Sequence, residues 1–165
     1  MSALSRQGKF ILLTLLVLLC LPLPAAGEGG GRALFINNPR TGLMARLPAQ
    51  DVDYVTIRFF HSYDCQWVEE SFKLVGGKFY PYEVSYGADT YDYRDQRYQS
   101  RARVGAHQVH LTDIKPRPSD ILAQIATRVA FTKPQQLILH TTKGNRVYLF
   151  TEWGRPGQPL VFSIK

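Results

Sequence analysis

Three consecutive stretches decide the fold class: Tyr54-Val-Thr-Ile-Arg-Phe-Phe-His-Ser62, Trp67-Val-Glu-Glu-Ser-Phe-Lys-Leu-Val75 and Lys78-Phe-Tyr-Pro-Tyr-Glu-Val-Ser-Tyr86. Apolar and polar side chains alternate along each stretch with a period of two, which is typical of half-buried β-strands. The pair Gly76-Gly77 between the last two stretches suits a two-residue hairpin turn. The pattern therefore predicts an antiparallel three-stranded sheet with one apolar face.

Further short strands are predicted on either side of this sheet, separated by residues that favour turns. They span Ala33–Asn37, Leu43–Leu47, Val104–Thr112, Gln135–Thr142, Arg146–Trp153 and Pro159–Ile164.

One segment changes period. The apolar residues Ile121, Leu122, Ile125 and Val129 recur at helical spacing after a potential N-cap, Ser119, so we expect a short helix within residues 119–131. With about eight or nine strands and one short helix, the expected fold is mainly β: a β-sandwich or a small open barrel.

The N-terminal 27 residues have the features of an export signal. Arg6 and Lys9 precede an apolar run from Phe10 to Leu21, and Ala25-Ala26-Gly27 offers small residues to a signal peptidase. We expect residues 1–27 to be a signal peptide and residues 28–165 to form a single β-rich domain in the periplasm or another extracytoplasmic space. The run is shorter than the roughly 20 residues of a membrane span, so membrane attachment is expected only if the signal is retained as an anchor.

Charge and cysteine content narrow the function classes. The chain has 20 Lys+Arg against 13 Asp+Glu, and the excess is spread without a dense basic run, which argues against nucleic-acid binding. Cys65 is the only cysteine outside the signal, so no internal disulfide is expected. No zinc-type Cys/His pattern and no phosphate-binding glycine loop is present, and no cofactor is expected.

Three ionisable side chains are expected to meet on the apolar face of the three-stranded sheet. A tight turn at residues 64–65 would pair Phe59 with Glu70 and bring His61 next to Glu70, and the glycine turn that follows would pair Glu70 with Glu83. Unpaired charges among apolar side chains cost several kcal/mol. Something must therefore compensate the charges of this predicted His/Glu/Glu cluster.

Three interpretations of the cluster remain open. It is a satisfied polar network that fixes strand register, a pocket for a ligand or partner, or a site where one imidazole and two carboxylates hold a divalent metal ion. No catalytic residue is assigned.

A polar loop is expected from Tyr86 to about Arg103, where tyrosines and arginines alternate with aspartates. Tyrosine and arginine are enriched in interface hot spots. The candidate partner surface therefore consists of Tyr91, Tyr93, Arg94, Arg97 and Tyr98. The alternative is an exposed loop that packs on itself.

The residues Thr41-Gly42-Leu43, Val55–Phe60, His61-Ser62, Val68-Glu69-Glu70, Glu83 and Ser85-Tyr86-Gly87-Ala88 carry a family resemblance. The chain resembles domain-of-unknown-function family 1850, which consists of small exported proteins with a His-Ser step followed by a Glu-containing strand. The likeness covers about residues 33–90. Asp89 and Thr90 stand where members typically carry a second glycine and a proline. The resemblance implies a gene position beside tripartite solute transporters and draws attention to His61, Glu70 and Glu83, but it implies no established activity.

The function expected from these features is a non-enzymatic extracytoplasmic accessory or binding domain. Its implied partner is a component of a substrate-binding-protein-dependent solute transporter, or the solute receptor of that transporter. The alternative is a β-domain that binds a metal or a small ligand through the His/Glu/Glu cluster. A third class is a hydrolase of unknown substrate that uses Glu70 or Glu83 as a general base.

Overall fold

The computed structural model describes residues 31–62, 65–87 and 98–165. Gly31–Lys165 forms one compact unit. The signal peptide predicted for residues 1–27 lies outside the described residues. No helix in the described part of the chain is both long and apolar enough to cross a membrane.

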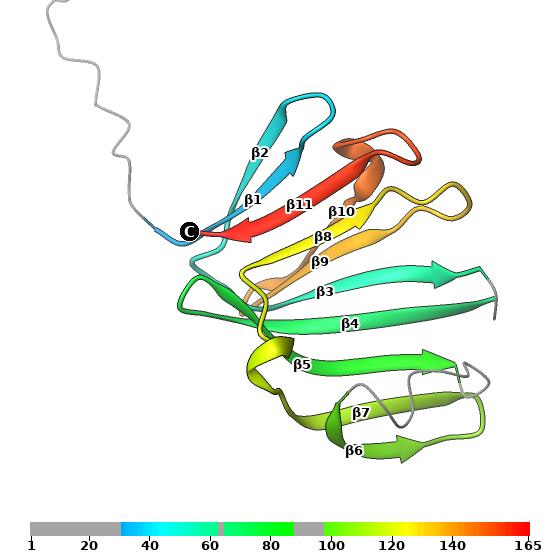
Figure 1. Ribbon diagram of the computed structural model, residues 1–165. Coiled ribbons are helices and arrows are strands. Elements are labelled where there is room, and N and C mark those ends of the chain that lie inside the picture. Colours follow the sequence, from blue (N-terminus) through cyan, green and yellow to red (C-terminus); the bar gives the residue numbers. More distant parts are fainter. Residues whose placement is uncertain (1–30, 63–64, 88–97) are drawn as a thin grey trace, which may run out of the picture. The chain divides into compact units, whose positions relative to one another are not determined.

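Two antiparallel sheets pack face to face as a β-sandwich (Figure 1). The four-stranded sheet has the order β2-β1-β11-β8 and consists of β1 (Ala33–Asn38), β2 (Leu43–Pro48), β8 (Gln124–Arg128) and β11 (Pro159–Ile164). The seven-stranded sheet has the order β10-β9-β3-β4-β5-β7-β6. Its strands are β3 (Val52–His61), β4 (Gln66–Val75), β5 (Lys78–Gly87), β6 (Gln99–Val104), β7 (Gln108–Lys115), β9 (Gln136–Thr141) and β10 (Gly144–Leu149).

The mainly-β prediction and its sandwich alternative are confirmed, with eleven strands in the described residues in place of eight or nine. Helical structure in the same residues consists of two short 3-10 helices, η1 (Pro118–Asp120) and η2 (Phe150–Glu152). The glycine turn pairs Leu74 with Phe79, as predicted. Gly76 and Gly77 both have positive φ angles, 55° and 72°, which a side chain would strain.

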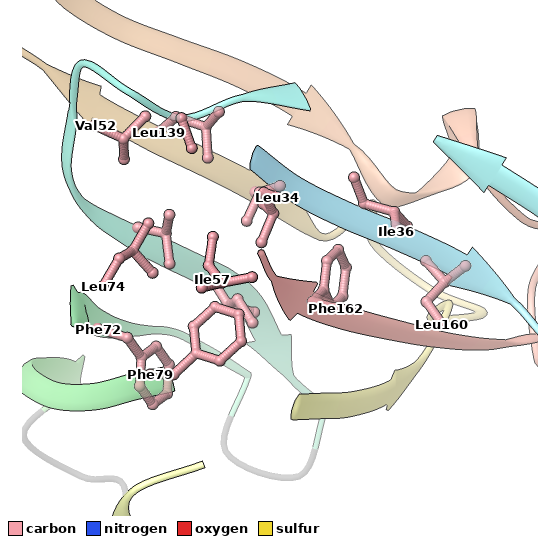
Figure 2. Close-up of a cluster of buried hydrophobic side chains, with 14 of the residues drawn as sticks. Leu34, Ile36, Val52, Ile57, Phe72, Leu74, Phe79, Leu139, Leu160 and Phe162 are labelled. Carbon is pink, nitrogen blue, oxygen red and sulfur yellow. The ribbon is translucent and has the colours of Figure 1, made fainter. Parts of the chain in front are cut away.

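The main core fills the space between the sheets (Figure 2). The four-stranded sheet contributes Leu34, Ile36, Leu160 and Phe162, and the facing sheet contributes residues such as Ile57 and Leu139. A second core cluster lies on β4, β5 and β7 and consists of Val68, Val84, Tyr86, Val109 and Leu111. The alternation of apolar residues along each strand places these side chains on one face.

The helix predicted within residues 119–131 is wrong. Its residues instead form η1, then a bridge in which Leu122 and Phe79 exchange two backbone hydrogen bonds (2.8 and 3.0 Å), then strand β8. A helical period and a strand period both place Ile125 and Val129 on the same side, so the apolar spacing alone does not distinguish a helix from a strand. The β-branched residues of this segment favour the strand, and pairing with β11 selects it.

The polar loop predicted to extend to about Arg103 ends earlier. Gln99–Val104 is strand β6, which pairs with β7 in an antiparallel ladder. The strand predicted over Val104–Thr112 is therefore divided into the end of β6, a turn, and most of β7. Both strands of a hairpin alternate with a period of two. The alternation alone therefore did not reveal the turn between β6 and β7.

Candidate functional site

The structure separates the three residues of the predicted cluster. Glu70 pairs with Ile57 and not with Phe59, because each β3 residue pairs with a β4 residue two positions earlier than predicted. His61 pairs with Gln66 at the end of β3. A shift by two residues keeps side chains on the same face, so His61 and Glu70 still share the inner face. They are about 13 Å apart along the strand direction, too far for direct contact.

A β-bulge in β5 moves Glu83 to the opposite face. Phe72 pairs with Pro81, while the adjacent Ser71 pairs with Glu83, so one extra residue lies in β5 between these pairs. Proline has no backbone N–H for the ladder, and proline within a sheet is largely confined to edges and bulges. Glu83 therefore lies on the outer face of the seven-stranded sheet, behind the face that carries Glu70.

The predicted meeting of His61, Glu70 and Glu83 at one place is thus wrong. Among the described residues, no three His, Cys, Asp or Glu side chains are grouped so that they hold a metal ion. The interpretation of the cluster as a metal site required three ligands in one place, and His61, Glu70 and Glu83 do not meet this requirement.

Glu70 lies instead in the wall of a groove between the two sheets. The groove has a volume of about 290 Å³ and runs between β8 and the inner faces of β3 and β4. Its uncharged lining consists of Ile57, Phe59, Phe72, Leu122, Ile125, Ala126, Thr127 and Gln135. Glu70 is half-buried and is the one ionisable residue among the described residues of this lining.

The groove follows from the unequal widths of the two sheets. The four-stranded sheet ends at β8, while the seven-stranded sheet continues beyond β4 through β5, β7 and β6 (Figure 1). The backbone bridge between Leu122 and Phe79 ties the segment before β8 to β5. The rim of the groove is therefore anchored to both sheets, and the groove belongs to the rigid part of the sandwich.

A second group of polar side chains lies on the outer face of the seven-stranded sheet. We define the outer-face cluster as Tyr54, Thr56, Ser71, Glu83 and His140. The Thr56 hydroxyl lies 2.8 Å from Ser71 Oγ and 2.8 Å from His140 Nε2. The His140 ring stacks on Tyr54 with 4.0 Å between the ring centroids. These contacts join β9, β3 and β4 across the sheet.

The hydroxyl groups of this cluster are enclosed. Thr56 is 3% exposed and Ser71 is 8% exposed. A serine or threonine that acts as a nucleophile must be reached by its substrate. The hydrogen-bonded chain from Ser71 through Thr56 to His140 is therefore a structural network that fixes the strand register.

Burial sets the electrostatics of the outer-face cluster. It lowers the pKa of His140, against smaller upward contributions from the Asn145 side chain and from the charges of Glu69 and Glu83. Burial also raises the pKa of Tyr54, and the charge of Glu83 adds to that shift. The charge of Glu83 thus acts on both aromatic side chains, in agreement with its place on the outer face.

The lowered pKa of His140 predicts a pH dependence of stability. The unfolded chain binds a proton at His140 more readily than the folded chain, so the free energy of unfolding should fall as the pH drops below about 6.5 towards the folded pKa. Urea unfolding measured at pH values on either side of about 6.5 checks this. The loss of stability on acidification should be smaller in His140→Gln than in the parent protein. It should be unchanged in His110→Gln, because His110 is an exposed histidine on β7. An unchanged slope in His140→Gln would contradict the assignment.

Two features of this site had signals in the sequence. Pro81 within an otherwise regular interior strand is a signal for a bulge, and a bulge reverses the face of every residue beyond it. The alternation in Leu137-Ile-Leu-His140 places His140 on the face opposite to the core residues Leu137 and Leu139. Its meeting with Thr56 depends on the pairing of β9 with β3, which joins segments far apart in the chain.

The candidate partner surface lies mostly beyond what the structure describes. Tyr91, Tyr93, Arg94 and Arg97 are outside the described residues. Tyr98 is half-buried and packs against the second core cluster. Much of the surface of the Tyr98 side chain is therefore covered by contacts within the domain.

Two of the residues to which the expected resemblance draws attention lie on opposite faces of the seven-stranded sheet: Glu70 faces the groove, and Glu83 faces outward beside Ser71. Comparison of the chain with protein-family models, with curated proteins and with solved structures gives no match.

Proposed function

We propose that this chain is an extracytoplasmic binding domain whose groove holds a small organic cation, with Glu70 as the anchoring carboxylate. The observation that carries the proposal is one carboxylate in a groove whose other described lining residues are uncharged. A carboxylate with apolar neighbours attracts a cationic group more strongly than one in water does, because the local dielectric constant is lower. The two oxygens of a carboxylate accept several hydrogen bonds, so Glu70 can serve a ligand and an internal partner together.

The size of the groove limits the ligand. A volume of about 290 Å³ lies at the lower end of known ligand pockets and equals that of about ten water molecules in the liquid. A ligand of about ten non-hydrogen atoms therefore fits. The apolar side chains favour an aromatic or branched body, and Glu70 favours an ammonium group at its end. Thr127 and Gln135 offer further hydrogen-bonding groups in the lining.

Two parts of the proposal come from the sequence. Export is supported by the basic start, the apolar run and the small residues within residues 1–27. Contact with a tripartite transporter component or its solute receptor is supported by the resemblance alone. Cross-linking in native membranes that recovers such a component supports this partner, and its repeated absence counts against it.

The groove proposal predicts a charge-dependent affinity. Phenethylamine has the expected size and charge, and its alcohol and carboxylate analogues are matched controls. The amine should bind best, and Glu70→Gln should weaken its binding about tenfold or more, because hydrogen bonds to charged groups contribute about 1.5–3 kcal/mol. Titration followed by ligand-observed NMR gives the affinities. Glu69→Gln is the matched control, since Glu69 faces outward and pairs with Arg58 at 3.2 Å.

Two outcomes would contradict the proposal. One is equal binding, or none, of the amine and its alcohol analogue by the parent protein. The other is an equal loss of binding in Glu70→Gln and Glu69→Gln. Glu70→Leu separates a binding role from a structural one: a ligand carboxylate predicts a folded variant that has lost the amine, whereas a register-fixing network predicts a variant that fails to fold.

A further inference from the structure

Three loops meet at one end of the sandwich, which we call the loop end. They are Asn38–Leu43, Arg128–Gln135 and Leu149–Gln158. Strands β1, β8 and β10 finish there, and their successors β2, β9 and β11 start there. In Figure 1 these loops lie towards the upper right of the sandwich.

Large apolar side chains are exposed at the loop end. Phe131 is 80% exposed, and Leu43 and Leu149 have smaller exposed fractions. Met44, which directly follows the first loop, is 71% exposed and lies at the adjoining edge of the outer face of the four-stranded sheet, opposite Asn37. Single exposed apolar residues need no explanation, but a concentration of them indicates an interaction surface.

The same loops carry positive charge. Arg40, Arg128, Lys133 and Arg155 are all exposed, and Glu152 is the one acidic residue within the three loops. Lys133 Nζ lies 3.9 Å from the centre of the Phe60 ring and 5.9 Å from that of Trp67. These contacts bring two half-buried aromatic rings from β3 and β4 to the edge of the loop end.

The loop end is held together from inside. The buried Asn38 side chain donates hydrogen bonds to the Trp153 carbonyl (3.0 Å) and to Gln158 Oε1 (3.1 Å). The Phe131 ring lies directly against Gly157, where an added Cβ would approach it to 2.6 Å. The exposed apolar groups are thus presented on fixed loops, which reduces the ordering that binding requires.

We propose that the loop end docks on an anionic lipid membrane. Phe131 and Met44 enter the interfacial region, while the arginines and Lys133 meet the phosphate groups of the lipids. Apolar insertion together with basic charge is the combination that gives stable peripheral binding. The apolar side chains belong to separate segments, with cations between them. Lipids can rearrange around such a surface. A protein partner would instead need a matching surface with pockets.

This membrane contact is independent of the groove and of the N-terminal signal. The sequence predicts membrane attachment only through a retained signal. The loop end provides a second route, which uses residues of the folded unit itself. A domain docked in this way would work beside a membrane-bound partner even after removal of residues 1–27.

Vesicle binding tests the proposal. The protein is purified as the cell produces it, and parent and variants are compared in the same form so that any contribution of residues 1–30 is common to all. The probes are vesicles of phosphatidylcholine alone and of phosphatidylcholine mixed with phosphatidylglycerol. Binding to the mixed vesicles should weaken about tenfold or more in Phe131→Ser, and by a similar factor in the double variant Arg40→Gln with Arg155→Gln.

Matched controls lie at the opposite end of the sandwich. Val75 is 54% exposed and pairs with Lys78 beside the Gly76-Gly77 turn. Val75→Ser and Lys78→Gln should leave vesicle binding unchanged. Equal binding by Phe131→Ser and the parent, or equal binding to the two kinds of vesicle, overturns the proposal. So does salt-sensitive binding to a soluble polyanion at the affinity found for the vesicles, because that result would assign the cations to a different partner.

Discussion

Replacing Phe162 with alanine should lower the free energy of unfolding by about 3–5 kcal/mol. Phe162 is 1% exposed in the middle of β11 and lies between the two sheets (Figure 2). Its ring centroid is 5.2 Å from that of Phe150 and 6.2 Å from that of Trp153. Truncation removes the apolar contact area and leaves a cavity that the rigid strands on either side cannot close.

Urea unfolding followed by tryptophan fluorescence measures this loss, because Trp153 packs against the ring that is removed. Such a loss is a large part of the roughly 5–15 kcal/mol that stabilises a typical domain. Phe131→Ala is the matched control, since the same atoms are removed from a ring that is 80% exposed. We expect the control to change stability by at most about 0.5 kcal/mol. Similar losses in both variants would mean that Phe162 does not lie in a closed core.

The fold class was predictable because strand faces depend on local alternation. Side chains two residues apart share a face, so the inner faces of β3 and β4 could be assigned from the sequence. That assignment survives an error of two residues in the register, as the pairing of Glu70 with Ile57 shows. The glycine turn at Gly76-Gly77 fixed its hairpin register from two residues alone.

The errors have equally local causes. The segment that contains β8 was predicted as a helix because a helical period and a strand period agree at Ile125 and Val129. Glu83 was assigned to the inner face because an uninterrupted ladder was assumed, and the bulge beside Pro81 reverses that face. The bulge therefore removed Glu83 from the predicted cluster, and the two-residue register shift between β3 and β4 separated His61 from Glu70.

The groove and the loop end depend on contacts that no local pattern encodes. The groove needs β8 to lie over β3 and β4, which are distant from β8 in the sequence. The loop end needs Asn38 to reach Trp153 across 115 residues of sequence. Glu70 was the one predicted site residue that the groove retains, because its position on the inner face required only the strand period.

Replacing Asn38 with leucine should lower the free energy of unfolding by about 3 kcal/mol. Asn38 is fully buried. Its amide donates to the Trp153 carbonyl and to Gln158 Oε1, and its Oδ1 accepts from the backbone N–H groups of Arg40 and Thr41. Leucine has the same number and branching of side-chain heavy atoms and no polar atoms, so the substitution leaves these groups without the partner that Asn38 supplies, in a buried site.

Because Asn38 connects two of the loops of the loop end, its loss should also be visible locally. Hydrogen exchange should accelerate at Arg40 and Thr41 and around Gln158, in addition to the fall in the urea midpoint. Asn37→Leu is the matched control, since Asn37 is exposed on the outer face of β1 and should change stability by at most about 0.5 kcal/mol. A loss below about 1 kcal/mol in Asn38→Leu would mean that water replaces the amide. The backbone hydrogen bonds of Val129 with Gly157 and Gln158 would then be sufficient to fix the loop end, and Asn38 would not be needed for the fixed presentation of Phe131.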